Sequence, residues 1–342
     1  MMKLLFNIFI VVAIFITTIL LICHLRYPFY YSVDSDVRWS VATGITKSLD
    51  SVAPQTVLCF KSVDEITPTL YLADPFVLEV DSGYFLFVEH VSDSNGNISW
   101  FYSDDFINWE FGDTVIDEIF HLSYPQIFTY NEEFYIIPES GQSEQVLLYK
   151  ADKFPDKWSI ADTLINDMVF KDPALLIKDD NFYLFGYDEK YVQRLYFSNT
   201  LFDNWQEHSA SPLGIGNTKR PGGRIFEYND AIYLPVQGTK RGYGSKLYLH
   251  KIKTLSPEYV SLDRSPQLFL EGFEHIKFFK NGVHHFDAIF KENKIFYAID
   301  GRGYEYEPVT LQVIRASLVK NGMDLLDFLG IIEIPDQFYS NL

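Results

Sequence analysis

The sequence predicts an all-β protein, a five-bladed β-propeller preceded by one N-terminal transmembrane helix. Three observations predict this fold class: an uncharged apolar segment near the N-terminus, an aromatic content of 17%, and a motif that recurs about every 50 residues. Aromatic side chains favour strands, and a repeat of this length built from short strands is typical of propeller blades.

The apolar segment Leu4–Cys23 reads LLFNIFIVVAIFITTILLIC and is long enough to cross the hydrocarbon core of a bilayer. A cleaved signal peptide is the alternative, but the apolar run is longer than a usual signal core and lacks an A-x-A-like exit. A lipoprotein signal would need a small residue in place of Ile22. We therefore expect residues 1–26 to be an uncleaved anchor and residues 27–36 a juxtamembrane linker. The domain of residues 37–342 is expected outside the cytoplasm or in a lumen.

The composition excludes several classes of function. The formal net charge of −18 repels phosphate backbones over most of the surface, so we expect no nucleic-acid binding. The two cysteines, Cys23 and Cys59, cannot form a disulfide framework or a cysteine-based metal site. The hydrophobic core must therefore stabilise the domain, and a chain of 342 residues can bury a large one.

Each unit of the repeat begins at a proline that precedes a short apolar run. Successive prolines lie 50, 48 and 48 residues apart, and they are Pro75, Pro125, Pro173 and Pro221. The runs read PFVLEV, PQIFTY, PALLIK and PGGRIF. A fifth, degenerate copy begins at His284 with HHFDAIF.

Three more strands are expected after each of these runs. The second strands read GYFLFVEH, EFYIIPES, NFYLFGYD and AIYLPVQG, and the third read ISWFYSDD, VLLYKADKF, RLYFSNTLF and KLYLHKI. A tryptophan opens a fourth strand in three units, at Trp109, Trp158 and Trp205. Four short strands in each of five units describe a five-bladed propeller.

A closed ring requires the two ends of the domain to meet. The early segment RWSVATG, which starts at Arg38, could add a strand to the last blade and so remove the open edge. A stacked solenoid is the alternative, but the degenerate fifth copy and this extra strand favour a ring. Residues 318–342 would close or cap the propeller, with one short helix over Lys320–Leu329.

The first strand of each propeller blade lines the axial channel, so the polar residues beside the prolines should converge there. They are Asp74, Tyr124, Asp172, Arg220 and, in the fifth blade, Asp287. The prolines have a structural explanation, because an X-Pro pair favours an extended start to a strand. Three acids and one arginine around an axis are costly unless they are paired, hydrated or functional.

Six segments in order resemble a known family: ADPFVL, HLSYPQIF, IIPES, RPGGRIF, YGSKLYL and HHFDAIF. Together they are similar to the N-terminal domain of the glucosamine inositolphosphorylceramide transferase family, which resembles the five-bladed propellers of glycoside hydrolase family 43. The resemblance covers about Arg38 to Asp300. In the plant transferases a separate glycosyltransferase domain follows the propeller. Because this chain ends at Leu342, we expect that domain to be missing and its transferase activity not to carry over.

The resemblance to family 43 implies three channel carboxylates: a base, an acid that tunes pKa values and a general acid. Asp74 stands at the position of the base. Tyr124 replaces the aspartate expected in the second blade, and Asp172 replaces the glutamate expected in the third. Glu89 and Glu139, at the ends of second strands, could supply the missing carboxylates. The candidate catalytic residues are Asp74, Glu139, Asp172 and Asp287.

The fourth blade concentrates positive charge in an otherwise acidic chain. The basic residues are Lys219, Arg220, Arg224, Lys240 and Arg241. Arginine binds phosphate oxygens through two parallel hydrogen bonds, so this cluster could hold a phosphate group. The alternative is that the two arginines neutralise Asp172 and Asp287 in a structural network, while the other basic side chains lie on a solvated loop.

Further side chains could complete a substrate site around the channel. The candidate substrate-binding residues are Glu89, His121, Tyr124, Arg220, Arg224, Gln237, Tyr243 and His285. Tyr124 and Tyr243, together with Phe76, could stack on sugar rings. His121 and His285 could bind a cation in the channel, but isolated histidines beside aromatic strands are more often hydrogen-bonded core groups. We therefore expect no resident metal and no organic cofactor.

Three functions fit these residues. The first is an anchored propeller that handles a carbohydrate or glycosyl-phosphate in the assembly of cell-surface glycans or glycolipids. Asp74 would act as acid or base, Arg220 and Arg224 would hold an anionic group, and His285 and Asp287 would complete the far wall. The second is a glycoside hydrolase with rearranged carboxylates, which needs a second carboxyl group about 5 to 9.5 Å from Asp74. The third is a non-catalytic glycan-binding or scaffold module that serves a separate glycosyltransferase.

Overall fold

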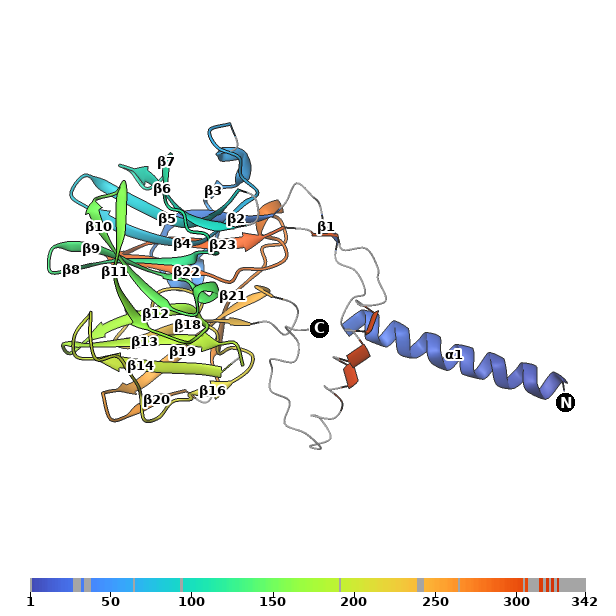
Figure 1. Ribbon diagram of the computed structural model, residues 1–342. Coiled ribbons are helices and arrows are strands. Elements are labelled where there is room, and N and C mark those ends of the chain that lie inside the picture. The colour runs from blue at the N-terminus through green and yellow to red at the C-terminus, as the bar shows by residue number, and fades with distance from the viewer. Residues whose placement is uncertain are drawn as a thin grey trace.

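The computed structural model describes residues 2–26, 32–33, 38–63, 65–92, 95–190, 192–238, 243–263, 265–303 and 305–306, with 314–315, 318–319, 321–322 and 325. Within these residues one long helix precedes five blades of antiparallel strands that surround a common axis (Figure 1). The predicted fold class, an all-β five-bladed propeller with one N-terminal helix, is confirmed.

The helix α1 (Met2–Arg26) stands apart from the propeller. Its stretch Phe6–His24 has a mean hydropathy of 2.8, and only 6% of that stretch is buried against the rest of the chain. By length and composition α1 could cross a membrane, and an N-terminal signal sequence would share both properties.

Blades one and two each contain four strands that pair in sequence order. Blade one contains β4 (Tyr71–Val80), β5 (Gly83–Val91), β6 (Gly96–Ser103) and β7 (Glu110–Ile116). Blade two contains β8 (Ser123–Tyr130), β9 (Glu133–Glu139), β10 (Val146–Lys153) and β11 (Lys157–Ile165). The predicted fourth strands are confirmed here, since β7 follows Trp109 directly and β11 includes Trp158.

Blades three and four each carry an additional short outer strand. Blade three contains β12 (Phe170–Lys178), β13 (Asn181–Asp188), β14 (Val192–Ser198) and β15 (Gln206–Glu207), and β16 (Gly214–Ile215) also pairs with β14. Blade four contains β17 (Phe226–Tyr228), β18 (Ala231–Gly238), β19 (Lys246–Leu255) and β20 (Val260–Leu262), and β21 (Gln267–Glu271) also pairs with β19. Short 3-10 turns lie elsewhere, at η1 (Leu49–Ser51), η2 (Phe60–Ser62), η3 (Gly141–Ser143) and η4 (Lys277–Phe279).

Blade five is assembled from both ends of the domain. Its order is β22 (Phe286–Lys291), β23 (Lys294–Arg302), β2 (Trp39–Thr46) and β3 (Thr56–Leu58). Trp39 pairs with Arg302 and Thr46 with Ile295, so the early strand closes the ring as expected and a solenoid is excluded. Beyond the blade, β1 (Ser32–Val33) pairs with β24 (Glu305–Tyr306).

Aromatic side chains fill the spaces between blades. Between blades one and two, the ring of Phe85 lies 4.7 Å from that of Phe154, and the ring of Phe87 lies 5.8 Å from that of Trp158. Large buried rings contribute most to the hydrophobic stabilisation of such an interface. This packing accounts for the high aromatic content of the sequence.

The residue before the proline is not extended in the first three blades. Asp74, Tyr124 and Asp172 have φ values of 49°, 50° and 49°, and each lies where the pairing of the first two strands shifts by a β-bulge. The extended conformation expected there is wrong, because the bulge takes this residue out of the ladder. A left-handed non-glycine residue costs about 1–2 kcal/mol. Because the same strained conformation recurs in three blades, we infer that it serves to place these three side chains around the channel.

The first strand of blade four differs from the others. It was expected to begin at Pro221, but Pro221 makes only an isolated bridge to Val236, and β17 begins at Phe226. Gly223 has a φ of 133°, and a Cβ atom there would lie 1.8 Å from the carbonyl oxygen of Phe286. The strand is interrupted because its glycines pass directly against blade five.

Two predictions concern residues outside the described ranges. The short helix over Lys320–Leu329 is described only at residues 321, 322 and 325, which are helical. The basic residues Lys240 and Arg241 are not described.

Candidate functional site

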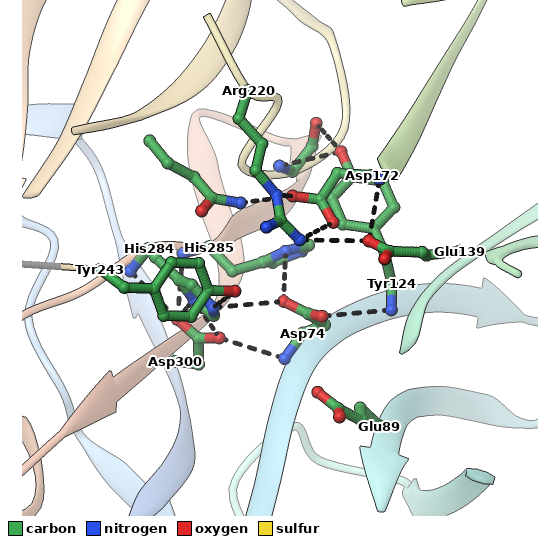
Figure 2. A network of polar contacts seen from close by, with 12 residues as sticks. Asp74, Glu89, Tyr124, Glu139, Asp172, Arg220, Tyr243, His284, His285 and Asp300 are labelled. Atoms are coloured by element: carbon green, nitrogen blue, oxygen red, sulfur yellow. Dashed lines mark hydrogen bonds and ion pairs between the residues drawn. The ribbon is translucent and has the colours of Figure 1, made fainter. Parts of the chain in front are cut away.

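Polar side chains from all five blades meet at the end of the propeller where the first strands begin (Figure 2). We call these residues the channel cluster: Asp74, Glu89, His121, Tyr124, Glu139, Asp172, Arg220, Gln237, Tyr243, His284, His285 and Asp300. In an antiparallel pair the second strand ends beside the start of the first. Accordingly Glu89 lies opposite Ala73, and Glu139 lies opposite Ser123. Most of these residues were predicted to share one site, and the structure brings them together.

Arg220 is paired with two carboxylates of neighbouring blades. Its Nε and Nη2 atoms donate to the two oxygens of Asp172, and Nη2 also donates to Oε2 of Glu139 at 3.1 Å. The side-chain amide of Gln237 donates to Oδ2 of Asp172 as well. The ring of Tyr243 lies 5.4 Å from the guanidinium carbon. Arg220 therefore neutralises buried carboxylates, as the structural alternative predicted, and its hydrogen-bond donors are not free to bind a phosphate.

The two carboxyl groups around Arg220 have opposite tendencies to ionise. Burial raises the pKa of Glu139 well above its usual range, and the charge of Arg220 offsets only part of that effect. Burial also acts to raise the pKa of Asp172, but the charge and hydrogen bonds of Arg220 outweigh it and lower that pKa. Asp172 is therefore held as a carboxylate while Glu139 holds a proton more readily.

Asp74 is held by its neighbours on both sides. Its Oδ2 accepts from the backbone N–H of Tyr124 at 3.2 Å, and its own N–H donates to Oδ2 of Asp300 at 3.1 Å. The other oxygen, Oδ1, lies 3.5 Å from Nδ1 of His285 and 3.9 Å from Nε2 of His284. One oxygen is thus fixed by the backbone, and the other faces two imidazoles.

Asp300 is a member of the cluster that was not predicted from the sequence. It is fully buried and accepts from the backbone N–H groups of Asp74, His284 and His285 and from Nδ1 of His284, the last at 2.8 Å. It lies near the end of the second strand of its blade, where Glu89 and Glu139 lie in theirs. Asp300 could have been predicted by aligning the second strand of the degenerate fifth copy with the second strands that end at Glu89 and Glu139.

His284 connects Asp300 to the rim of the channel. Its Nε2 lies 3.1 Å from the hydroxyl of Tyr243, and its ring stacks on that of Trp39 at 4.0 Å. Burial acts to lower the pKa of His284, but the charge and hydrogen bond of Asp300 outweigh it and raise that pKa. Burial likewise acts to raise the pKa of Asp300, and the charge of His284 outweighs it and lowers that pKa.

Glu89 and His121 form a second acid–imidazole pair. Nε2 of His121 lies 3.1 Å from Oε1 of Glu89, while Nδ1 accepts from the backbone N–H of Gly96 at 2.9 Å. Burial raises the pKa of Glu89, and the hydrogen bond to Glu89 raises that of His121. Because Nδ1 of His121 accepts the backbone N–H of Gly96, it cannot carry a proton of its own. The geometry therefore favours a neutral His121 that donates from Nε2 to the Glu89 carboxylate.

Replacing Gly96 by alanine is expected to disturb this pair. The added Cβ would lie 2.7 Å from Cε1 of His121 and 2.4 Å from the carbonyl oxygen of Leu122. We expect the free energy of unfolding to fall by about 1–3 kcal/mol, as for other overpacked sites, measured by urea denaturation. The matched control is Gly322→Ala, where a Cβ meets nothing within 4 Å. Equal stability of the two variants would contradict the prediction.

Tyr124 and His285 form the buried wall of the site. Tyr124 is fully buried, and its hydroxyl donates to the carbonyl oxygen of Gly223 at 2.7 Å and accepts from the N–H of the same residue. It has no surface for stacking on a sugar, and neither has the fully buried Phe76. His285 packs against the edges of both rings, and within the described part of the chain its ring nitrogens make no hydrogen bond. Of the three proposed stacking residues only Tyr243 is exposed, with 42% of the residue accessible, and the guanidinium of Arg220 lies over one face of its ring at 5.4 Å.

Arg224 and Asp287 are paired with each other. Asp287 is fully buried; its Oδ1 accepts from Nε of Arg224 at 2.7 Å, and its Oδ2 accepts from the backbone N–H of Val77 at 2.7 Å. Nη2 of Arg224 also donates to the carbonyl oxygen of Val77 at 3.3 Å. These contacts join blades one, four and five, so Arg224 and Asp287 form the structural ion pair that was the alternative to a phosphate site. Both oxygens of Asp287, a candidate catalytic residue, are engaged in these contacts.

Three residues of the cluster have the chemistry and spacing for a cation. Ligand atoms of Asp74, His284 and Asp300 all lie within 4.8 Å of one another, and all three residues are buried. The sequence-level candidates for a cation, His121 and His285, are not members of this group. Hydrogen bonds among the three residues account for their placement without an ion.

Comparison with known proteins points to one family. Residues 38–301 match the family described as glucosamine inositolphosphorylceramide transferase 1, N-terminal. The glucosamine inositolphosphorylceramide transferase 1 of Oryza sativa subsp. japonica is 34% identical over 220 residues, which cover 60% of this chain and 29% of that protein. The Arabidopsis thaliana protein of that name is 30% identical over 252 residues, which cover 69% and 33% of the two chains. The chain therefore spans about a third of the length of these relatives.

Solved structures share the fold. An exo-1,5-α-L-arabinanase from a bovine ruminal metagenomic library aligns with a TM-score of 0.51 and 15% identity over 71% of this chain and 93% of the enzyme. The α-L-arabinofuranosidase of Podospora anserina, solved with cellotriose, aligns with a TM-score of 0.51 and 10% identity over 81% and 99% of the two chains. At these identities the likeness is one of fold.

Proposed function

The chain belongs to the family of the glucosamine inositolphosphorylceramide transferase 1 N-terminal domain, and from that premise we propose that its channel cluster binds a glycan in the assembly of cell-surface glycans or glycolipids. The fold, which glycosidases also use, supports a carbohydrate ligand without specifying one. The residues of the cluster carry the rest of the proposal.

The observation that carries this proposal is the meeting of several carboxylates with an accessible aromatic ring at one end of the propeller axis. Sugar hydroxyls donate hydrogen bonds to carboxylates, and the apolar face of a sugar ring packs on an aromatic ring. Tyr243 supplies the accessible ring, and Asp74 and Glu139 supply the nearby acids. His121, whose side chain is 28% exposed, lies beside Glu89 at the same end of the propeller.

The charge around the channel favours a sugar over a phosphate in contact with it. Arg220 is paired with Asp172 and Glu139, and Arg224 is paired with Asp287. A phosphate would have to displace a buried carboxylate from its arginine, which is costly. We therefore place the sugar part of the ligand at the cluster.

Hydrolysis of a glycosidic bond is the second candidate function. It is favoured by the raised pKa of Glu139, because glycosidases use a carboxyl group with a raised pKa as the general acid. In this mechanism Asp74 would be the base and Glu139 the proton donor. The second-blade and third-blade positions, Tyr124 and Asp172, differ from the family 43 pattern.

Replacing Asp74 by asparagine is expected to weaken ligand binding while preserving the fold, because the amide oxygen can still accept from the N–H of Tyr124. The full chain in lipid nanodiscs would be screened by thermal shift against neutral oligosaccharides, sugar phosphates and nucleotide sugars, since a ligand of the native state raises the melting temperature. We expect neutral glycans to stabilise the protein and Asp74→Asn to weaken that binding at least about tenfold, a loss of about 1.4 kcal/mol. The control is Asp104→Asn, at an exposed aspartate on the opposite end of blade one.

The outcomes separate the candidate functions. Stabilisation by neutral glycans with cleavage products indicates a hydrolase, and stabilisation without turnover indicates a binding module. Stabilisation by phosphorylated sugars alone, lost in Arg220→Ala, would move the phosphate to the cluster and contradict the placement of the sugar there. Retention of the full ligand shift in Asp74→Asn would remove Asp74 from the site.

A further inference from the structure

The chain enters and leaves the propeller at the rim of the channel cluster. Trp39, the first residue of β2, pairs with Arg302, the last residue of β23, and Val41 pairs with the cluster residue Asp300. The ring of Trp39 stacks on that of His284. The polypeptide that joins the propeller to α1 therefore begins against the candidate site itself.

The connection between α1 and this rim is short. Five residues lie between Arg26, the end of α1, and Ser32, the start of β1, so the Cα atoms of these two residues are at most about 22 Å apart. β1 is held against β24, which starts three residues after β23 ends. Asn321 in the C-terminal segment donates to the carbonyl oxygen of Cys23 in α1 at 3.4 Å. Figure 1 shows β1 and α1 on the same side of the propeller.

The turns at the opposite end of the propeller contain acidic residues, and Lys178 and Lys291 at the same end form ion pairs with Asp179 and Glu79. At that end the first two strands of every blade are joined by a two-residue turn, and each turn contains an acidic residue. The turns are Asp81-Ser82, Asn131-Glu132, Asp179-Asp180, Asn229-Asp230 and Glu292-Asn293. These turns lie at the end of the propeller away from Trp39 and Arg302, where the chain connects to α1.

We propose that the end of the propeller carrying the channel cluster faces the bilayer in which α1 is inserted. A glycan displayed on that bilayer can then reach the cluster, whereas the opposite end points away from it. This inference rests on the proposed function of the cluster as a glycan site and on α1 remaining as an anchor. The end of the propeller that carries the channel cluster thus contacts the surface of the protein's own membrane.

The orientation can be measured without knowing the ligand. Two exposed isoleucines in blade one serve as matched label positions: Ile119 (96% exposed) follows β7 at the channel end, and Ile107 (55% exposed) follows β6 at the other end. Each would be changed to cysteine in a Cys23→Ser, Cys59→Ser full-length background, labelled with a donor dye and reconstituted in phosphatidylcholine vesicles with an acceptor lipid. Strands of this length separate the two ends by about 25 Å. We expect higher energy transfer from position 119, and equal or higher transfer from position 107 would overturn the orientation.

A binding measurement tests the consequence for the ligand. The glycan with the largest thermal shift would be coupled to phosphatidylethanolamine and placed in the same nanodisc as the full chain, and its apparent affinity compared with that of the free glycan. We expect a gain of about 10²-fold for the membrane-bound form from confinement near the site. A 20-residue Gly-Ser insertion after Arg26 should reduce this gain. A gain that is unchanged by the insertion, or absent, would overturn the inference.

The failure of this inference can be told apart from failure of the proposed function. Binding of free glycans with the wrong orientation leaves the glycan site standing and overturns the membrane-facing arrangement. The predicted orientation without binding of any glycan supports the arrangement and overturns the glycan function. A mature protein that lacks α1, shown by intact mass in its native cells, would overturn the membrane-facing arrangement directly.

Discussion

Replacing Arg220 by alanine is expected to lower the free energy of unfolding by about 3–5 kcal/mol, the usual cost of leaving a buried charge without its partner. Asp172 is almost fully buried and receives two hydrogen bonds from Arg220, and Glu139 receives a third. Removal of the guanidinium leaves both carboxyl groups in a low-dielectric site. Urea denaturation monitored by tryptophan fluorescence measures the loss.

Two variants show whether burial is the cause. Lys150→Ala removes one partner of the exposed ion pair with Glu133, and solvent screens such pairs so that they contribute little to stability. Arg220→Lys keeps the charge but loses the two-pronged geometry, so its stability should fall between those of the wild type and Arg220→Ala. A loss below about 1 kcal/mol in Arg220→Ala would show that the cluster relaxes or hydrates without its arginine.

The blade arrangement could be predicted because it depends on local patterns that repeat. The prolines at residues 75, 125 and 173 mark the bulges of the first strands, and the tryptophans mark the fourth strands. The closing strand from Arg38 was predictable from the chemistry of open edges. The interruption after Pro221 was not, since it depends on a contact between Gly223 and Phe286 of the next blade.

The repeat made part of the site predictable, because residues at equivalent positions of successive blades lie around the same channel. Asp74 and Asp172 stand beside prolines, and their position in the cluster follows from the repeat. Asp300 was missed because the fifth blade has no proline to align it. Neutralisation of Asp172 and Asp287 by the two arginines stayed an open alternative, because sequence spacing does not show which acid each arginine contacts.

Sequence reasoning also could not foresee which groups would be accessible. Tyr124 and Tyr243 were equivalent candidates for stacking, yet the hydroxyl of Tyr124 is engaged by Gly223 and its ring is covered by blade packing. Tyr243 lies at the rim beside Trp39, where the chain enters the ring. Accessibility therefore follows from the closure of the propeller, and the same closure places the connection to α1 beside the candidate site.

Replacing Asp300 by asparagine is expected to destabilise the protein by about 3–5 kcal/mol near pH 6 and by less at higher and lower pH, because it breaks a fully buried acid–imidazole pair. The raised pKa of His284 stabilises the fold below the unfolded value of about 6.5, and this contribution is lost as pH rises through the folded pKa. The lowered pKa of Asp300 stabilises the fold above the unfolded value of about 3.9, and this contribution is lost as pH falls through the folded pKa.

The contribution of the pair should therefore be greatest between about pH 4 and pH 6.5. Urea denaturation of wild type and Asp300→Asn across pH 3.5 to 9 (on the order of ten conditions) measures the difference in unfolding free energy as a function of pH. His284→Gln should remove the same pH dependence, and the double variant should lose less than the sum of the two single losses because the residues act as one unit. A residual loss at high pH is expected in Asp300→Asn, since the backbone N–H groups of Asp74, His284 and His285 still need an acceptor. A difference that does not vary with pH would mean that Asp300 stabilises the site only through those backbone bonds and that His284 is neutral in the folded protein.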